Sequence, residues 1–181
     1  LRFSRDGRLM QTWRGGSVSP SPVAMALADG GTTLLVADDS LRQWVEFRPV
    51  GAFPMPVPPS DAVRSVDGIA ASGDKVFVLD RNAGLVHVAQ RDGQLVGRLG
   101  AGELKQPVAV AADRFARVFV VDAQDRSVKL LAAGRPAQVF DAAALRVQAI
   151  GGIAIDERLL AVSDRQTGQV IIHTLGSEAR P

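Results

Sequence analysis

The protein has 181 residues, of which 46% are hydrophobic and 22% charged, and its formal net charge is +2. This composition is typical of a globular chain with one substantial core, and it excludes intrinsic disorder. Because the sequence contains no cysteine and only two histidines, His87 and His173, disulfides, thiolate metal sites and a histidine-rich metal site are excluded in this chain. No stretch approaches the roughly 20 apolar residues that a membrane-spanning helix needs.

The start of the sequence bears on its origin. It begins at Leu1 rather than at a methionine, and no signal peptide is visible. We therefore expect a processed chain or a part of a longer one. Together with the lack of cysteine, this favours an extracytoplasmic location, periplasmic or secreted, with a cytoplasmic fragment as the alternative.

A regular repeat organises the sequence. Four apolar runs end in an aspartate, and these motif aspartates are evenly spaced along the chain: Asp38, Asp80, Asp122 and Asp164. Short aliphatic segments bounded by Gly, Asp, Asn or Pro surround each aspartate, a pattern typical of strands and turns. Four short strands in a unit of about 40–45 residues are the signature of a β-propeller blade. The prediction is an all-β propeller with four-stranded blades.

The predicted domain organisation is a single propeller or a portion of one. Its expected blades are residues 22–60, 66–100, 107–140 and 152–175. The last repeat stops after its third strand, and residues 1–15 form a partial blade that offers the missing closing strand, which would remove an exposed sheet edge. Two interpretations stay open: a complete four-bladed ring, or a part of a six-bladed propeller.

The third repeat carries a resemblance to a known family. The segments PVAVAAD at 107–113, VFVVD at 118–122 and DRSVKL at 125–130 resemble an NHL repeat, and residues 68–88 and 152–172 are similar but looser. The resemblance implies a propeller, most often six-bladed, that binds proteins, nucleic acids or small ligands on one face. It also implies kinship with six-bladed propellers that include metal-dependent lactonases.

The motif aspartates are predicted to be structural turn residues, since each carboxylate can accept hydrogen bonds from amides two or three residues further on. A ring of ligand-binding carboxylates is the alternative. An arginine follows each aspartate, and pairing between them would give a nearly neutral rim of individually weak ion pairs. These arginines are candidate interaction residues: Arg42, Arg81, Arg126 and Arg165.

Few residues point to catalysis. Where the first strands begin at the axis, Asp67 is the one acidic residue, whereas a hard cation needs several oxygen ligands. Asp67 is therefore a weak metal candidate, and we predict no metal site. No Ser–His–Asp or paired-carboxylate arrangement is evident, so no catalytic residue and no cofactor are predicted. His87 and His173 fall on third strands, where we expect them to be solvated or packed at a blade edge.

A nucleic-acid site has weak support. Arg114, Arg117, Arg126 and Lys129 make a modest basic cluster, but the chain has no tyrosine and only 5% aromatic residues on which bases could stack. RNA binding through this basic face is thus the third functional hypothesis.

The proline-rich segment 50–59 occupies the place of a fourth strand. Because proline cannot donate to a β-ladder, we expect an extended strip on the outer wall. Its candidate docking residues are Phe53, Pro54, Met55 and Pro56. The preferred function is a non-catalytic protein-interaction or scaffolding propeller, a subunit or accessory module of a larger assembly with a protein partner. The alternative is a ligand-binding or metal-dependent, lactonase-like propeller that uses its axial face for a small ligand.

Overall fold

The computed structural model describes residues 2–12, 19–48, 55–56, 62–156 and 158–175. In that part of the chain the one helical element is the short turn η2 (Asp29–Gly31), and the remaining elements are strands. The strands form four antiparallel sheets and a separate N-terminal hairpin.

The four sheets follow one another along the chain. The first contains β3 (Pro22–Ala28), β4 (Thr33–Asp38), β5 (Gln43–Phe47) and β6 (Met55–Pro56). The second contains β7 (Gly68–Ser72), β8 (Lys75–Asp80), β9 (Leu85–Gln90) and β10 (Leu95–Leu99). The third contains β11 (Pro107–Ala112), β12 (Val118–Asp122), β13 (Ser127–Ala132) and β14 (Arg135–Asp141). The fourth contains β15 (Ile150–Ile155), β16 (Leu159–Asp164) and β17 (Val170–Thr174).

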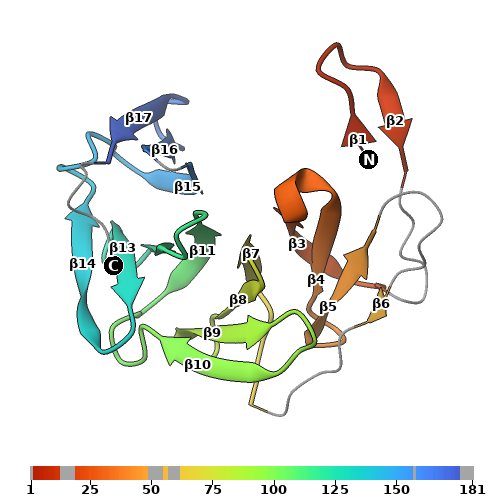
Figure 1. The fold of residues 1–181 in the computed structure, drawn as a ribbon. Helices are drawn as coiled ribbons and strands as arrows, with labels where there is room; N and C mark the ends of the chain where they lie inside the picture. The colour runs from red at the N-terminus through yellow and green to blue at the C-terminus, as the bar shows by residue number, and fades with distance from the viewer. Residues whose placement is uncertain (1, 13–18, 49–54, 57–61, 157, 176–181) are drawn as a thin grey trace.

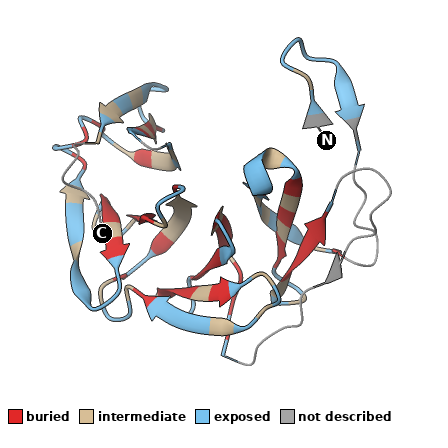
Figure 2. Cartoon of the chain, viewed as in Figure 1, coloured by how far each residue is buried: buried red, intermediate tan, exposed pale blue. Residues whose placement is uncertain are grey.

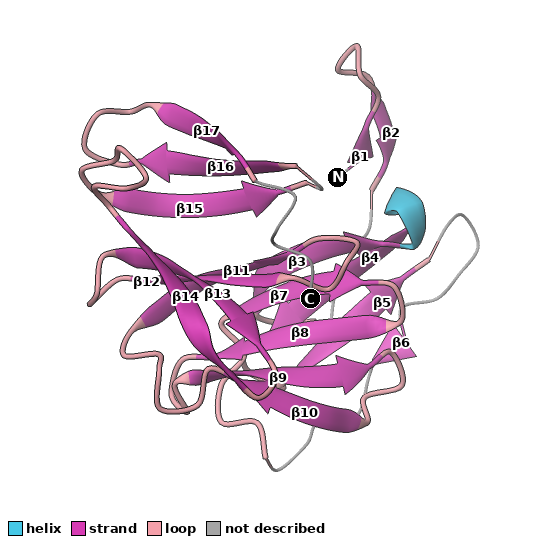
Figure 3. Cartoon of the chain, turned by 60° about the vertical axis from the view of Figure 1, so that its left-hand side comes forward, coloured by secondary structure: helices cyan, strands magenta, loops and turns pink. Residues whose placement is uncertain are grey.

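The sheets are arranged as propeller blades. Within each sheet the strands pair in chain order as an up-and-down meander (Figure 3). Their first strands lie innermost and contact one another, β3 with β7, β7 with β11, and β11 with β15, while the later strands lie further out (Figure 1). This arrangement confirms the predicted all-β propeller fold, and the sheets are called blades one to four below.

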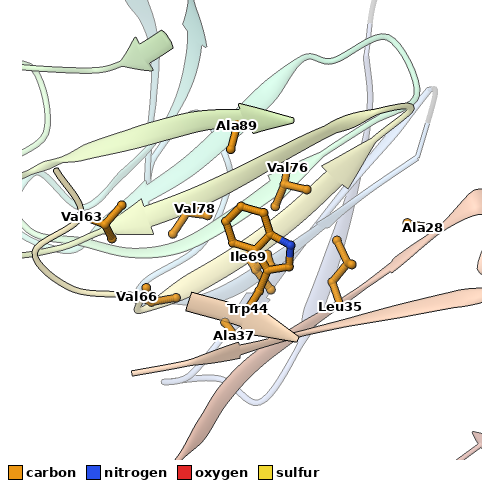
Figure 4. Close-up of a cluster of buried hydrophobic side chains, with 10 residues drawn as sticks. All are labelled: Ala28, Leu35, Ala37, Trp44, Val63, Val66, Ile69, Val76, Val78 and Ala89. Carbon is orange, nitrogen blue, oxygen red and sulfur yellow. The ribbon is translucent and has the colours of Figure 1, made fainter. Parts of the chain in front are cut away.

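The core lies between neighbouring blades. Leu35, Ala37 and Trp44 of blade one pack against Ile69 and Val78 of blade two (Figure 4). Similar clusters join blades two and three and blades three and four. The second strands of blades two and three are consequently buried along most of their length (Figure 2). Burial on both faces explains why their sequences are continuous apolar runs and do not alternate.

The N-terminal hairpin pairs β1 (Arg2–Phe3) with β2 (Leu9–Gln11). Its turn matches the turn between β9 and β10, since Gly7 and Gly93 both have positive φ and close equivalent hydrogen bonds. The hairpin thus has the form of the third and fourth strands of a blade. Within the described residues the two strands of the hairpin pair with each other alone, so the closing role expected for residues 1–15 stays a prediction.

The proline-rich segment is described only at β6, which pairs with β5 through Glu46–Met55 and Val45–Pro56. That pairing places Met55 and Pro56 on the outermost strand of blade one. Phe53 and Pro54 lie outside the described residues.

Candidate functional site

The motif aspartates are buried where each second strand ends. In blade two, one carboxylate oxygen of Asp80 accepts a hydrogen bond from the Ala83 amide at 2.8 Å, and the other accepts from the Arg64 amide at 2.7 Å. The first donor belongs to the turn after β8, and the second to the loop before β7. The other motif aspartates make the same two kinds of contact, with amide donors Leu41 and Ser21, Asp125 and Lys105, and Gln166 and Gln148. Each carboxylate therefore ties two loops of its blade together.

These hydrogen bonds hold the carboxylates ionised. Burial raises the pKa of Asp80, but the amides of Arg64 and Ala83 and the ring of His87 outweigh it, so that the pKa lies below its usual value. The Gln148 amide is the main cause that lowers the pKa of Asp164, to about 2. All four pKa values are shifted downward.

The arginines that follow the motif aspartates make other contacts. Arg81 donates from Nε to the Pro107 carbonyl of the next blade at 3.2 Å, and its ion pair is with Asp67 at 3.5 Å. Arg126 likewise donates to the Gln148 carbonyl at 3.1 Å, before blade four. These two side chains therefore bridge neighbouring blades. Arg42 and Arg165 are exposed.

Asp67, the weak metal candidate, is held by protein donors. Its Oδ2 accepts from the Ser65 hydroxyl at 2.6 Å and from the Arg81 amide at 2.9 Å. Across the described ranges, no group of three or more His, Cys, Asp or Glu side chains gathers as a metal site would require. The carboxylate thus contributes to the loop structure beside β7.

The histidines differ from each other. His87 is 1% exposed, and its Nε2 lies 3.1 Å from Asp80 Oδ2, so the expectation of a solvated or edge position is wrong for this residue. The reason is that β9, the third strand of blade two, is itself buried along most of its length. His173 is partly exposed, and its Nε2 lies 2.9 Å from the Leu145 carbonyl.

The four residues of the basic cluster do not form a single cationic surface. Lys129 is buried and bound to Asp122 and Asp125, and Arg117 is buried and paired with Asp113. Arg114 lies over the ring of Phe115, 4.7 Å from its centroid. Carboxylates therefore neutralise two of the four cations, which weakens the RNA-binding hypothesis.

Several hollows are lined by described residues, and three of them bear on function. One of about 260 Å³ lies at the axis where the inner strands end, next to Asp29, Asp113 and Asp156. It is at the opposite end of these strands from Asp67, the position that the sequence suggested. A cleft of about 460 Å³ opens between blades two and three, and a third hollow of about 330 Å³ lies beside His87.

The face of blade one that is turned away from blade two, called its outer face below, is apolar and exposed along β3. Val23, Met25 and Leu27 alternate along β3 and are exposed, whereas Ala24 and Ala26 between them pack on the core. The far face of blade four is similar, with exposed Leu159, Val170 and Ile172. Our sequence reasoning missed both faces. The signal available for the first was the alternation of large and small side chains along β3.

Known structures share this architecture. The nidogen/laminin complex contains a chain that is 17% identical with a TM-score of 0.57, over 85% of this chain and 76% of that one. The fold is a β-propeller. Virginiamycin B lyase from Staphylococcus aureus is 9% identical with a TM-score of 0.56, over 87% of this chain and 56% of the lyase. Hydrazine synthase from Kuenenia stuttgartiensis is 12% identical with a TM-score of 0.56, over 86% of this chain and 50% of that one.

At these identities the likeness establishes the propeller fold and nothing finer. Neither protein-family models nor curated protein sequences match this chain, so the resemblance to NHL repeats stays a prediction. None of the described segments is a helix long and apolar enough to cross a membrane.

Proposed function

We propose that this propeller is a non-catalytic protein-interaction module, a subunit of a larger assembly, and that its partner packs on the outer face of blade one. The observation that carries the proposal is the row of exposed apolar side chains on β3, Val23, Met25 and Leu27. A contiguous exposed apolar patch of this kind is typical of a protein-binding surface.

Comparison between blades strengthens the proposal. Met25 pairs with Val36 two residues before Asp38, and Ile69 pairs with Val78 two residues before Asp80, so Met25 and Ile69 are equivalent. Ile69 is buried against blade one, whereas no described residue covers Met25 to that degree. The face of β3 therefore has the chemistry of a blade-to-blade contact. A partner suited to it presents an aliphatic sheet face and few charges.

Native mass spectrometry of the protein isolated gently from its source tests this function. We expect the wild-type chain in a complex heavier than its own 19.1 kDa. Met25→Asp is expected to abolish the complex, because it buries an unpaired carboxylate in the contact. Val139→Asp, at an exposed apolar position on β14, is the matched control and is expected to leave the complex intact. A lone wild-type species, or a complex that survives Met25→Asp, would contradict the proposal.

A ligand-binding propeller is the second candidate, favoured by the axial hollow beside Asp29, Asp113 and Asp156. The similarity in fold to virginiamycin B lyase is compatible with it. Calcium-dependent thermal stabilisation is the test, since a ligand that binds the folded state alone raises the melting temperature. An unchanged melting temperature would count against a calcium site in this hollow.

A further inference from the structure

In blade three, one carboxylate bridges the ammonium groups of two lysines, Lys105 and Lys129. The ammonium group of Lys129 on β13 is 2.9 Å from Asp122 and 2.6 Å from Asp125. The second oxygen of Asp125 lies 2.6 Å from the ammonium group of Lys105. The Asp125 carboxylate therefore stands between two lysines, and together with Asp122 it balances their two positive charges.

Blade two keeps the basic positions but lacks the carboxylate. His87 lies one full repeat before Lys129, and Ala83 lies one full repeat before Asp125. Arg64 takes the place of Lys105, because each donates its backbone N–H to the motif aspartate of its blade. A methyl group thus stands where blade three has the bridging carboxylate.

A hollow of about 330 Å³ occupies this place. Its lining consists of Ala62, Arg64, Ala83, Leu85, His87 and Arg98. The two arginines in this lining make no ion pair with any residue of the described ranges. Arg98 is the register partner of His87 across β10 and β9, so both belong to the same face of the sheet. The hollow therefore combines a cationic rim with an aliphatic wall.

His87 supplies an independent observation. Its Nε2 is engaged by Asp80, but its Nδ1 is buried and has no hydrogen-bond partner within the described residues. Buried polar atoms of this kind are rare, because an atom that loses its water without gaining a hydrogen-bond partner destabilises the fold. The equivalent ammonium group in blade three has three oxygen partners, namely Asp122, Asp125 and the Glu103 carbonyl.

We propose that this hollow binds a small aliphatic carboxylate, whose carboxylate group takes the place that Asp125 fills in blade three. Arg64 and Arg98 bind the anion, and the alkyl chain lies against Ala62 and Leu85. The site is separate from the proposed protein-binding face on β3, and it does not depend on that function.

Isothermal titration calorimetry with butyrate tests the proposal, and butyramide, which has a similar shape and no charge, is the control ligand. We expect saturable binding of one butyrate per chain and no binding of butyramide. Arg98→Gln and Arg64→Gln are each expected to weaken butyrate binding by about tenfold or more, because a charge-assisted hydrogen bond is lost. Arg135→Gln, an exposed arginine on β14, is the control and should bind as the wild type does.

Two further variants move the bridging carboxylate between blades two and three. Ala83→Asp is expected to abolish butyrate binding and to raise the melting temperature, because it supplies the carboxylate from within the chain. Asp125→Ala is expected to add a second butyrate site between Lys105 and Lys129. The proposal is overturned if butyrate fails to bind saturably, or if Arg64→Gln and Arg98→Gln both bind it as tightly as the wild type. Arg64 and Arg98 are exposed, so we expect their variants to fold. They therefore test the proposal even if Ala83→Asp fails to fold.

Discussion

Met25 and Ile69 occupy the same register position on the inner strands of neighbouring blades, yet Met25 is 72% exposed and Ile69 is 5% exposed. The difference arises because blade one packs on Ile69, whereas the equivalent face of β3 is left uncovered among the described residues. The same residue position is therefore core in one blade and surface in the other.

This relationship predicts opposite responses to one substitution. Ile69→Asp should destabilise the fold by about 3 kcal/mol or more, because it places an unpaired charge in the core between blades one and two. Met25→Asp should change the free energy of unfolding by less than about 0.5 kcal/mol, since its side chain stays in water. Urea denaturation followed by circular dichroism measures both values. Equal losses of stability would show that the two positions are equally buried in solution.

The motif aspartates predict a second contrast between adjacent residues. Asp38→Ala should cost about 3 kcal/mol or more, because it leaves the buried Ser19 hydroxyl and the partly buried amides of Ser21 and Leu41 without an acceptor. Asp39→Ala changes an exposed neighbour and should cost less than about 0.5 kcal/mol. Denaturant midpoints of the two variants test the prediction, which would be wrong if Asp39→Ala were the more damaging change.

The stability of the propeller should fall as the pH is lowered through the pKa values of the motif aspartates. The pKa values of the four motif aspartates are lowered in the folded protein, to about 2 for Asp164, whereas an unfolded aspartate titrates near 3.9. Their contribution to stability is thus complete above the unfolded pKa and is lost as the pH falls through the folded pKa. Urea midpoints should be lower at pH 2.5 than at pH 5. In Asp164→Asn the difference between these two midpoints should be smaller.

Two phenylalanines of blade three allow a test of the interblade core. Phe119 is fully buried against blade four, so Phe119→Ala should cost about 3–5 kcal/mol. Phe115 is exposed in the turn before β12 and contacts Arg114 and Arg117, so Phe115→Ala should cost about 1 kcal/mol or less. Thermal unfolding of both variants gives the comparison, and similar melting temperatures for the two would contradict the assigned core.

The sequence predicted the repeated blades well, but it did not predict which charged side chains are paired and buried. The even spacing of the motif aspartates predicted the blades because hydrogen bonding within a blade is local in sequence. The spacing of Arg117 and Lys129 along the chain suggests a basic surface, but their carboxylate partners Asp113 and Asp122 make them buried ion pairs. Charge counts along a chain do not reveal such pairing, because it depends on which side chains the strands bring together.

The sequence by itself determined the all-β architecture, the four-stranded repeat of the blades and the position of each motif aspartate at the end of a second strand. These features follow from short-range patterns of apolar, glycine and aspartate residues. Only the tertiary structure decided that Met25 is exposed while Ile69 is buried, and that a hollow lies beside His87 where Ala83 replaces an aspartate. Exposure and cavities depend on which blade lies against which, and that contact joins residues far apart in the chain.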